Sequence, residues 1–391
     1  MSDFVIIPDG SGDLTREQRE KFKIERNLPG TVLWPDKVSR QAEIDWDSIT
    51  PNEYFAMMTS KKNVFKTSLP APKEIYDLLE KYAKEGKNMI IPTISGAMSG
   101  TFSVITKTAE ELMEDYPGVK IHVIDSRRYG GACGLLAVTA ALCRDKGMSF
   151  KETCDYLDKA TLNIHEAGFL DDLYFLHRSG RVSKMAAVMG TMIGIKPMGD
   201  FNHKGTTAIL GKAKGLNNAF KADIEYIKKT IVNSEEQIIF VAHSDRPKEA
   251  EKYAQMIRDN IPCKEVIVTL IGQGCGVNAG PGLISAYYQG TPISIDNVEE
   301  IKIMNDINLI SEEEVNVEEL LKNVAGNTKT AFPEVTGDKF AYYFYLLDVG
   351  MRSFGQEFIR KMAQPQYINI LTDAIHCLVE TFAESDVNKE N

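Results

Sequence analysis

The amino-acid sequence predicts an α/β fold with two α/β domains, the first of them a parallel sheet covered by helices, followed by a C-terminal helical extension. Short apolar runs alternate with segments of helical periodicity, which is typical of a parallel sheet with helices on both faces. The chain has 391 residues, more than one average domain needs. Near its end, two long aromatic-rich segments, Phe340–Met362 and Gln366–Glu384, predict a helical hairpin. We therefore expect domains at 1–163 and 164–290 and an extension at 291–391.

The composition excludes several classes of protein. Hydrophobic residues make up 43% and charged residues 26% of the chain, as in ordinary soluble globular proteins. The formal net charge of −10 argues against a nucleic-acid surface, which needs a basic stripe. The opening residues lack the pattern of a signal peptide, and no apolar run reaches the roughly 18 residues of a transmembrane segment. We expect a cytoplasmic protein.

Metal and nucleotide cofactors are not indicated. The six cysteines and six histidines are scattered, and no two cysteines form a CxxC pair. Buried free thiols in a reducing compartment are the simpler interpretation. The dinucleotide fingerprint GxGxxG is absent, and the lone GxG of Gly10 and Gly12 is weak evidence. We expect no cofactor.

The most informative stretch is Asn88–Phe102, which predicts a strand, a turn of small residues and a helix. This arrangement places backbone N–H groups at the start of a helix and at the carboxyl edge of a sheet, where they attract anions. The hydroxyls of Ser95 and Ser99 add further donors. The alternative is a tight turn whose serines only cap the helix, and the sequence leaves both open.

Two other stretches place polar groups in comparable positions. Asp9 and Ser11 follow an apolar strand, where they form either part of the same polar site or a plain turn. Thr67 and Ser68 precede a helix that starts with a proline. Thr67 either caps that helix or directs its hydroxyl toward Ser95.

Three later segments have less regular patterns. Met185–Met198 contains four methionines among small residues, which suits either the lining of a flexible apolar ligand or an ordinary core. Gly272–Gly282 predicts a glycine-dense loop that another group approaches closely. Ser294–Glu319 predicts an acidic, weakly structured segment as far as Ser311, where a helix begins.

Several of these pieces together resemble the DegV family of bacterial fatty-acid-binding proteins. In order, they are IIPDGSGDL, KTSLPAP, ISGAMSGTF, VIDS, DDLYFLHRSGRVS, IGIKP and GVNAGPG, and they span Val5 to Tyr288. Each piece alone is unspecific, but their order and spacing are specific.

The resemblance implies two α/β domains with a long-chain fatty acid in a tunnel between them. It also implies a non-catalytic carrier that presents the carboxyl group to a partner fatty acid kinase. By resemblance, Thr67 and Ser95 hold the carboxyl group, while Arg181 and Lys196 belong to the family signature and are interpreted here as structural. The expected tunnel lining is Met98, Met185, Met189, Met192 and Ile195.

The sequence departs from the family pattern at three places. Asn278 stands where the family commonly has a histidine that contacts the carboxyl group; asparagine donates a hydrogen bond but carries no charge. Gly96 replaces a common second serine. Lys214 stands near the position of an arginine used for partner docking, and lysine does not reproduce a bidentate contact. These departures concern the head group and the transfer to a kinase, not the binding of the lipid tail.

Two alternative functions follow from the same residues. A serine hydrolase or acyltransferase would use Ser95 or Ser99, with His243 as base and Asp245 nearby. The stretch is not GxSxG, however, so the nucleophile-elbow pattern is missing. A sugar- or phosphate-binding domain would use the anion site with a shallow polar pocket.

Overall fold

The computed structural model describes residues 4–60, 62–171, 173–182, 194–307, 362–370 and 372–373. The chain divides into two units, 1–309 and 310–391. Most of the two predicted C-terminal helices lies outside the described residues. In the part of this segment that the structure does describe, residues 368–370 are helical. The predicted domain boundaries at 163 and 290 remain predictions.

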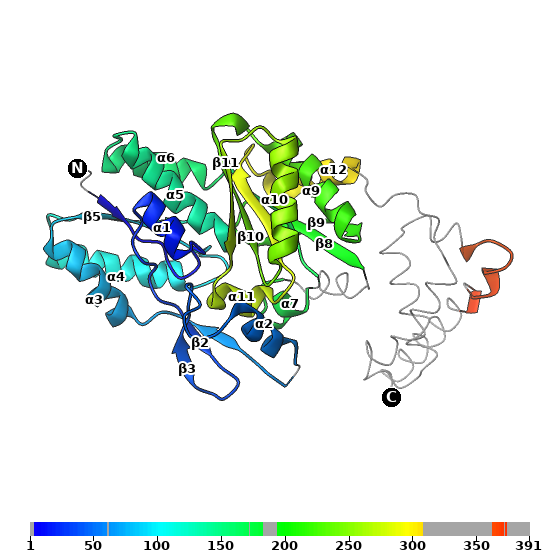
Figure 1. Cartoon of the computed structure of the whole chain (residues 1–391), viewed down its shortest axis with the longest axis horizontal. Coiled ribbons are helices and arrows are strands. Elements are labelled where there is room, and N and C mark those ends of the chain that lie inside the picture. The colour runs from blue at the N-terminus through cyan, green and yellow to red at the C-terminus, as the bar shows by residue number, and fades with distance from the viewer. Residues whose placement is uncertain are drawn as a thin grey trace, which may run out of the picture. The chain divides into compact units, whose positions relative to one another are not determined.

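The first sheet is parallel, as the sequence predicts. Its strand order is β1-β5-β6, with bounds Phe4–Ile6, Asn88–Thr93 and Ile121–Asp125. Helices α3 (Pro72–Lys84) and α4 (Thr101–Asp115) pack against it and against each other (Figure 1). Their apolar stripes form one core with the strands, although Leu78, which the periodicity places in the stripe, is 38% exposed.

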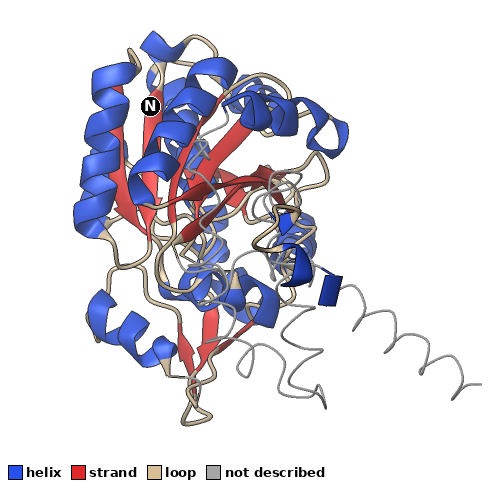
Figure 2. Ribbon diagram, turned by 90° about the vertical axis from the view of Figure 1, so that its right-hand side faces the viewer, coloured by secondary structure: helices blue, strands red, loops and turns tan. Residues whose placement is uncertain are grey.

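The second sheet is mixed and has six strands in the order β11-β10-β12-β7-β8-β9. Their bounds are Glu265–Leu270, Ile238–His243, Ile284–Gln289, Ile164–Phe169, Ile195–Phe201 and Thr207–Lys214. The β10–β11 pair is parallel and the other pairs are antiparallel. Helices α9 (Leu216–Thr230), α10 (Pro247–Asn260) and α12 (Val298–Ile307) pack against its strands. In Figure 2 the strands of both sheets lie among the covering helices.

We call the part of the chain around the first sheet the first lobe and the part around the second sheet the second lobe. A small antiparallel sheet, β3-β2-β4, extends from the first lobe (Figure 1). Its strands are Ser39–Gln41, Thr31–Leu33 and Lys66–Ser68. Near it lie α2 (Pro51–Thr59) and α11 (Gln273–Ala279), and α11 in turn contacts α7 (Tyr174–Arg178). Strands β2 and β3 form an antiparallel hairpin.

Helix α5 (Gly131–Asp145) joins the two main sheets, because it contacts β1 and β5 of the first and β10 and β12 of the second. Eleven of its fifteen residues are buried, in keeping with its apolar composition. A side chain at Gly134 would place its Cβ 2.4 Å from the carbonyl oxygen of Gly12. This close approach requires glycine and fixes the helix beside the first strand–helix loop. Helices α1 (Arg16–Phe22) and α6 (Phe150–Ala160) pack on α5, and each begins at a capping box, formed by Thr15 and Gln18 and by Ser149 and Glu152.

The α/β fold class is confirmed, whereas two local predictions are wrong. The glycine-dense segment Gly272–Gly282 is mostly the helix α11, because its backbone is buried beneath Tyr54 and Phe55 and must satisfy its own hydrogen bonds. The segment after Ser294 contains a 3-10 turn, Ile295–Asn297, and helix α12, whose Met304 packs into the second core. No helix among the described residues is long and apolar enough to cross a membrane.

Candidate functional site

A cavity of about 490 Å³ opens where the carboxyl ends of β1 and β5 meet helix α11. Its volume lies within the range of roughly 300–1,000 Å³ that is usual for small-molecule sites. The first lobe supplies the loops after β1 and β5 and strand β4, and the second half of the chain supplies Arg181 and part of α11. The cavity therefore lies between the two lobes, at the sheet edge where ligands of α/β proteins bind.

Ser95 does not line this cavity. Its side chain is fully buried, and its Oγ donates to the carbonyl oxygen of Gly205 at 2.7 Å. The same Oγ accepts from the backbone N–H of Ala97 at 3.2 Å. Gly205 lies in the β8–β9 turn with φ +83, a conformation that favours glycine. Ser95 therefore fastens the turn after β5 to the second sheet.

The hydroxyls that this turn directs to the cavity belong to Ser99 and Thr101. They lie 2.9 Å apart, and the backbone N–H of Thr101 donates to Ser99 Oγ at 3.3 Å. Thr101 is also the first residue of α4, so the positive end of that helix faces the cavity. The sequence analysis predicted Ser99 as a donor but did not include Thr101. The order Ser-Gly-Thr at the start of a helical stripe is the signal that would have indicated it.

Asp9 holds the floor of the cavity together. Its Oδ1 accepts from the N–H and the hydroxyl of Ser11, at 2.8 and 2.5 Å, and its Oδ2 accepts from the N–H of Ile94 at 2.9 Å. The carboxyl thus joins the loops that follow β1 and β5. Burial raises its pKa above the ordinary range, and these hydrogen bonds oppose that shift.

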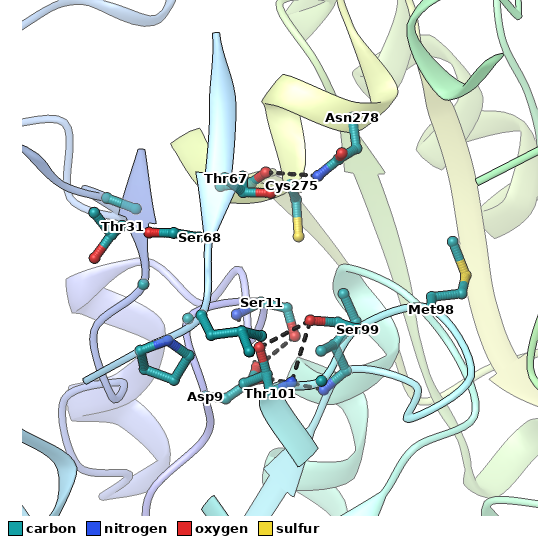
Figure 3. Close-up of a pocket in the computed structure, with 18 of the residues that line it drawn as sticks. Asp9, Ser11, Thr31, Thr67, Ser68, Met98, Ser99, Thr101, Cys275 and Asn278 are labelled. Carbon is teal, nitrogen blue, oxygen red and sulfur yellow. Dashed lines mark hydrogen bonds between the residues drawn. The ribbon is translucent and has the colours of Figure 1, made fainter. Parts of the chain in front are cut away.

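Thr67 and Asn278 lie across the cavity from Asp9, Ser99 and Thr101 (Figure 3). Thr67 sits in β4 and does not cap α3, whose N-cap is Ala71. Within the described ranges its hydroxyl has no hydrogen-bond partner. The side-chain amide of Asn278 donates to the carbonyl oxygen of Gly274 at 3.3 Å and also interacts with the hydroxyl of Tyr129.

The charged side chains in the described lining are Asp9 and Arg181. Arg181 is half-buried and also donates to the carbonyl oxygen of Ser179. Lys196 pairs instead with Asp171 at 2.6 Å, and Arg246 binds the other oxygen of that carboxylate. The structure places Arg181 at the cavity and Lys196 in an ion-pair cluster away from its lining.

An apolar pocket of about 40 Å³ adjoins the polar cavity, and Met98 and Tyr129 line both. Most of its wall comes from apolar side chains of the second lobe: Leu170, Leu176, Phe201, Ile209 and Leu283. Polarity therefore falls from the first lobe to the second.

The remaining predicted residues are distributed differently. Ile195 is buried in β8 but does not line either space. Met185, Met189 and Met192 lie outside the described residues. Lys214 is exposed at the end of β9.

Among the described residues, Ser95, Ser99 and His243 do not form a serine hydrolase site. His243 is buried, outside the cavity lining, and its Nδ1 accepts from the backbone N–H of Arg246 at 3.2 Å. Burial lowers the pKa of His243 to about 4. The hydroxyls of Ser95 and Ser99 bond to Gly205 and Thr101 rather than to a base. In the described part of the chain, no group of three His, Cys, Asp or Glu side chains is placed to hold a metal ion.

A comparison of the sequence with models of known protein families identifies the family of this chain. The family described as "Uncharacterised protein, DegV family" matches residues 3–290. The chain belongs to the DegV family. A DegV domain-containing protein of Clostridium perfringens is 31% identical over 297 residues, covering 74% of this chain and 98% of that relative.

Solved DegV-family structures share this fold. A Thermotoga maritima protein described as revealing a fatty acid binding function has a TM-score of 0.65 and 19% identity, covering 74% of this chain and all of that one. A Eubacterium eligens DegV family protein loaded with heptadecanoic acid has a TM-score of 0.65 and 20% identity, covering 73% and 99%. The Fatty Acid Kinase (Fak) B3 protein of Streptococcus pneumoniae, loaded with linoleic acid, has a TM-score of 0.63 and 22% identity, covering 74% and 99%.

Proposed function

We propose that this chain binds a long-chain fatty acid between its two lobes and presents the carboxyl group to a partner fatty acid kinase, without itself catalysing a reaction. The supporting observation is the change in polarity along the cavity. Hydroxyl, amide and helix-terminal donors line the larger cavity, whereas the exposed wall of the smaller pocket beyond Met98 and Tyr129 is mainly apolar. A molecule with one polar end and one hydrocarbon end matches this order.

The carboxylate end lies between Thr67 and Asn278 on one side and Ser99 and Thr101 on the other. A hydrogen bond to a charged group contributes about 1.5–3 kcal/mol, and the start of α4 adds about 0.3–1 kcal/mol. Arg181 supplies a compensating positive charge at the same cavity. Ser95 acts through the backbone, by holding the turn that presents Ser99.

The hydrocarbon tail runs past Met98 and Tyr129 into the second lobe. Each buried methylene contributes about 0.8 kcal/mol, so roughly fifteen would give roughly 12 kcal/mol before ordering costs. The tail therefore supplies most of the affinity, whereas the polar groups determine which end of the ligand enters first. The pocket of about 40 Å³ is smaller than such a tail, so binding a long chain requires this pocket to widen.

The kinase partner rests on family membership and on the description of the Streptococcus pneumoniae neighbour. Lys214, exposed at the end of β9, is the proposed docking residue. Incubating the loaded protein with a fatty acid kinase and ATP tests this step; formation of acyl phosphate supports it. No acyl phosphate with a kinase active on another DegV carrier would contradict it.

Uptake of ligand by delipidated protein tests the binding function. Native mass spectrometry should show one added stearate per chain, and Thr67→Val should retain less than wild type. Thr59→Val, an exposed helical threonine outside the cavity, is the matched control. If delipidated protein acquires no long-chain fatty acid, binding is excluded. Labelling of Ser99 by a fluorophosphonate would favour the hydrolase instead.

A further inference from the structure

Glu166 introduces a carboxyl group into the apolar pocket. It lies in β7, at the middle of the second sheet, and only 8% of it is exposed. Its Oε1 accepts from Ser285 Oγ at 2.9 Å and from the Tyr287 hydroxyl at 3.0 Å. Its Oε2 is buried and has no hydrogen-bond partner. A buried oxygen without a partner costs free energy, so this atom needs an explanation.

The other charged groups near the pocket have hydrogen-bond partners of their own. Asp200, which also lines the pocket, accepts from the backbone N–H groups of Glu166 and Phe201 and from the hydroxyl of Tyr226. Arg128 is buried and donates to the carbonyl oxygens of Ile164 and Arg127. Of the two carboxyl groups in the described pocket wall, Glu166 alone has an oxygen without a partner.

Two glycines line the pocket near this carboxyl. Gly168 and Gly199 form part of its wall on the neighbouring strands β7 and β8. At Gly168, a Cβ would lie 2.0 Å from Ser285 Oγ, so a side chain there would displace the group that binds Glu166. Glycine thus keeps the carboxyl and its two hydroxyl donors together at the pocket.

We propose that the tail pocket selects an acyl chain with a hydroxyl group on its hydrocarbon part, and that Glu166 binds this hydroxyl. The inference rests on the proposed fatty-acid binding and specifies the class of fatty acid. A hydroxyl both donates and accepts, so it pairs with either protonation state of a carboxyl. Burial raises the pKa of Glu166 to about 7, so both states occur near neutral pH. A plain methylene chain would leave Oε2 without a partner.

Competition binding to delipidated wild-type protein tests the proposal. Stearic acid is compared with monohydroxystearic acids that carry the hydroxyl at successive positions from the middle of the chain toward its methyl end. At least one isomer should bind about tenfold more tightly than stearic acid, the preference expected when a buried acceptor gains its partner. If no isomer binds better than stearic acid, the proposal is overturned. The same result is expected if an ordered water, rather than a ligand hydroxyl, is the partner of Oε2.

Substitution links the preference to its residue. Glu166→Met should abolish the preference for the hydroxylated isomer, and Glu166→Gln, which keeps a hydrogen-bonding group, should retain part of it. Glu225→Met, on the exposed face of α9, should leave the preference intact. A preference that survives Glu166→Met would overturn the assignment. If Glu166→Met does not fold, the wild-type isomer series still decides. Failure of every fatty acid to bind would instead refute the proposed function.

Discussion

Replacing Thr67 with valine removes one hydroxyl from the cavity while keeping the shape of the side chain. Thr67 lies in strand β4 and its hydroxyl has no partner among the described residues, so the change breaks no internal hydrogen bond. Valine also favours strands. We therefore expect folding to be preserved and the effect to appear in ligand binding alone.

The magnitude follows from the charge of the ligand. A hydrogen bond to a carboxylate contributes about 1.5–3 kcal/mol, which corresponds to a loss of affinity of about 10-fold to 150-fold. Titration calorimetry on delipidated protein measures this loss for stearic acid and for its methyl ester. The ester carries no charge, so Thr67→Val should weaken its binding much less.

The control and the refuting result are defined by the same titrations. Thr59→Val should bind both ligands as wild type does. Equal losses for acid and ester on Thr67→Val would show that the hydroxyl does not contact the carboxylate. No loss for either ligand would place the polar end elsewhere in the cavity.

Three further predictions concern stability. Ser95→Ala should lower the free energy of unfolding by about 1–3 kcal/mol in urea titration, because the buried carbonyl of Gly205 loses its donor; an unchanged midpoint would contradict the fastening role. The contribution of Glu166 to stability should fall as pH rises from about 4.5 to about 7, by at most about 1.4 kcal/mol per pH unit, because its raised pKa makes the folded state bind the proton more tightly than the unfolded state. Buried His243, with its pKa lowered to about 4, contributes the opposite slope over part of this range, so the prediction concerns the difference between variants. Glu166→Gln should remove the falling contribution from the urea-titration profile, and a profile that keeps the shape of the wild-type one would assign the slope to other groups. Gly134→Ala should cost about 1–3 kcal/mol because α5 cannot move away from the neighbouring backbone, while Gly118→Ala, which meets nothing, should be neutral; similar values would contradict the close approach.

The sequence predicts those parts of the fold that depend on neighbouring residues. The capping boxes at Thr15 and Ser149 each join residues three positions apart, so the sequence alone indicates where both helices start. The strand–turn–helix at Asn88–Phe102 follows from a change of period within fifteen residues. Such signals need no knowledge of distant segments.

Long-range contacts explain what the sequence did not show. The hydroxyl of Ser95 is withdrawn by Gly205, 110 residues away, so its role as a direct ligand could not be judged from the turn alone. Helix α11 forms despite its glycines because aromatic side chains of α2 cover it. The carboxyl of Glu166 reaches the tail pocket only through pairing of β7 with β12, two fully or largely buried strands without an alternating pattern.

A crystal structure of the protein saturated with stearic acid tests the central claim most directly. We expect continuous acyl density between the lobes, with a carboxylate oxygen within about 3.2 Å of Thr67 Oγ1 or the Asn278 amide and the chain passing Met98 toward Tyr129. A carboxylate in the second lobe, or density that never reaches the space between Thr67 and Ser99, would contradict the account.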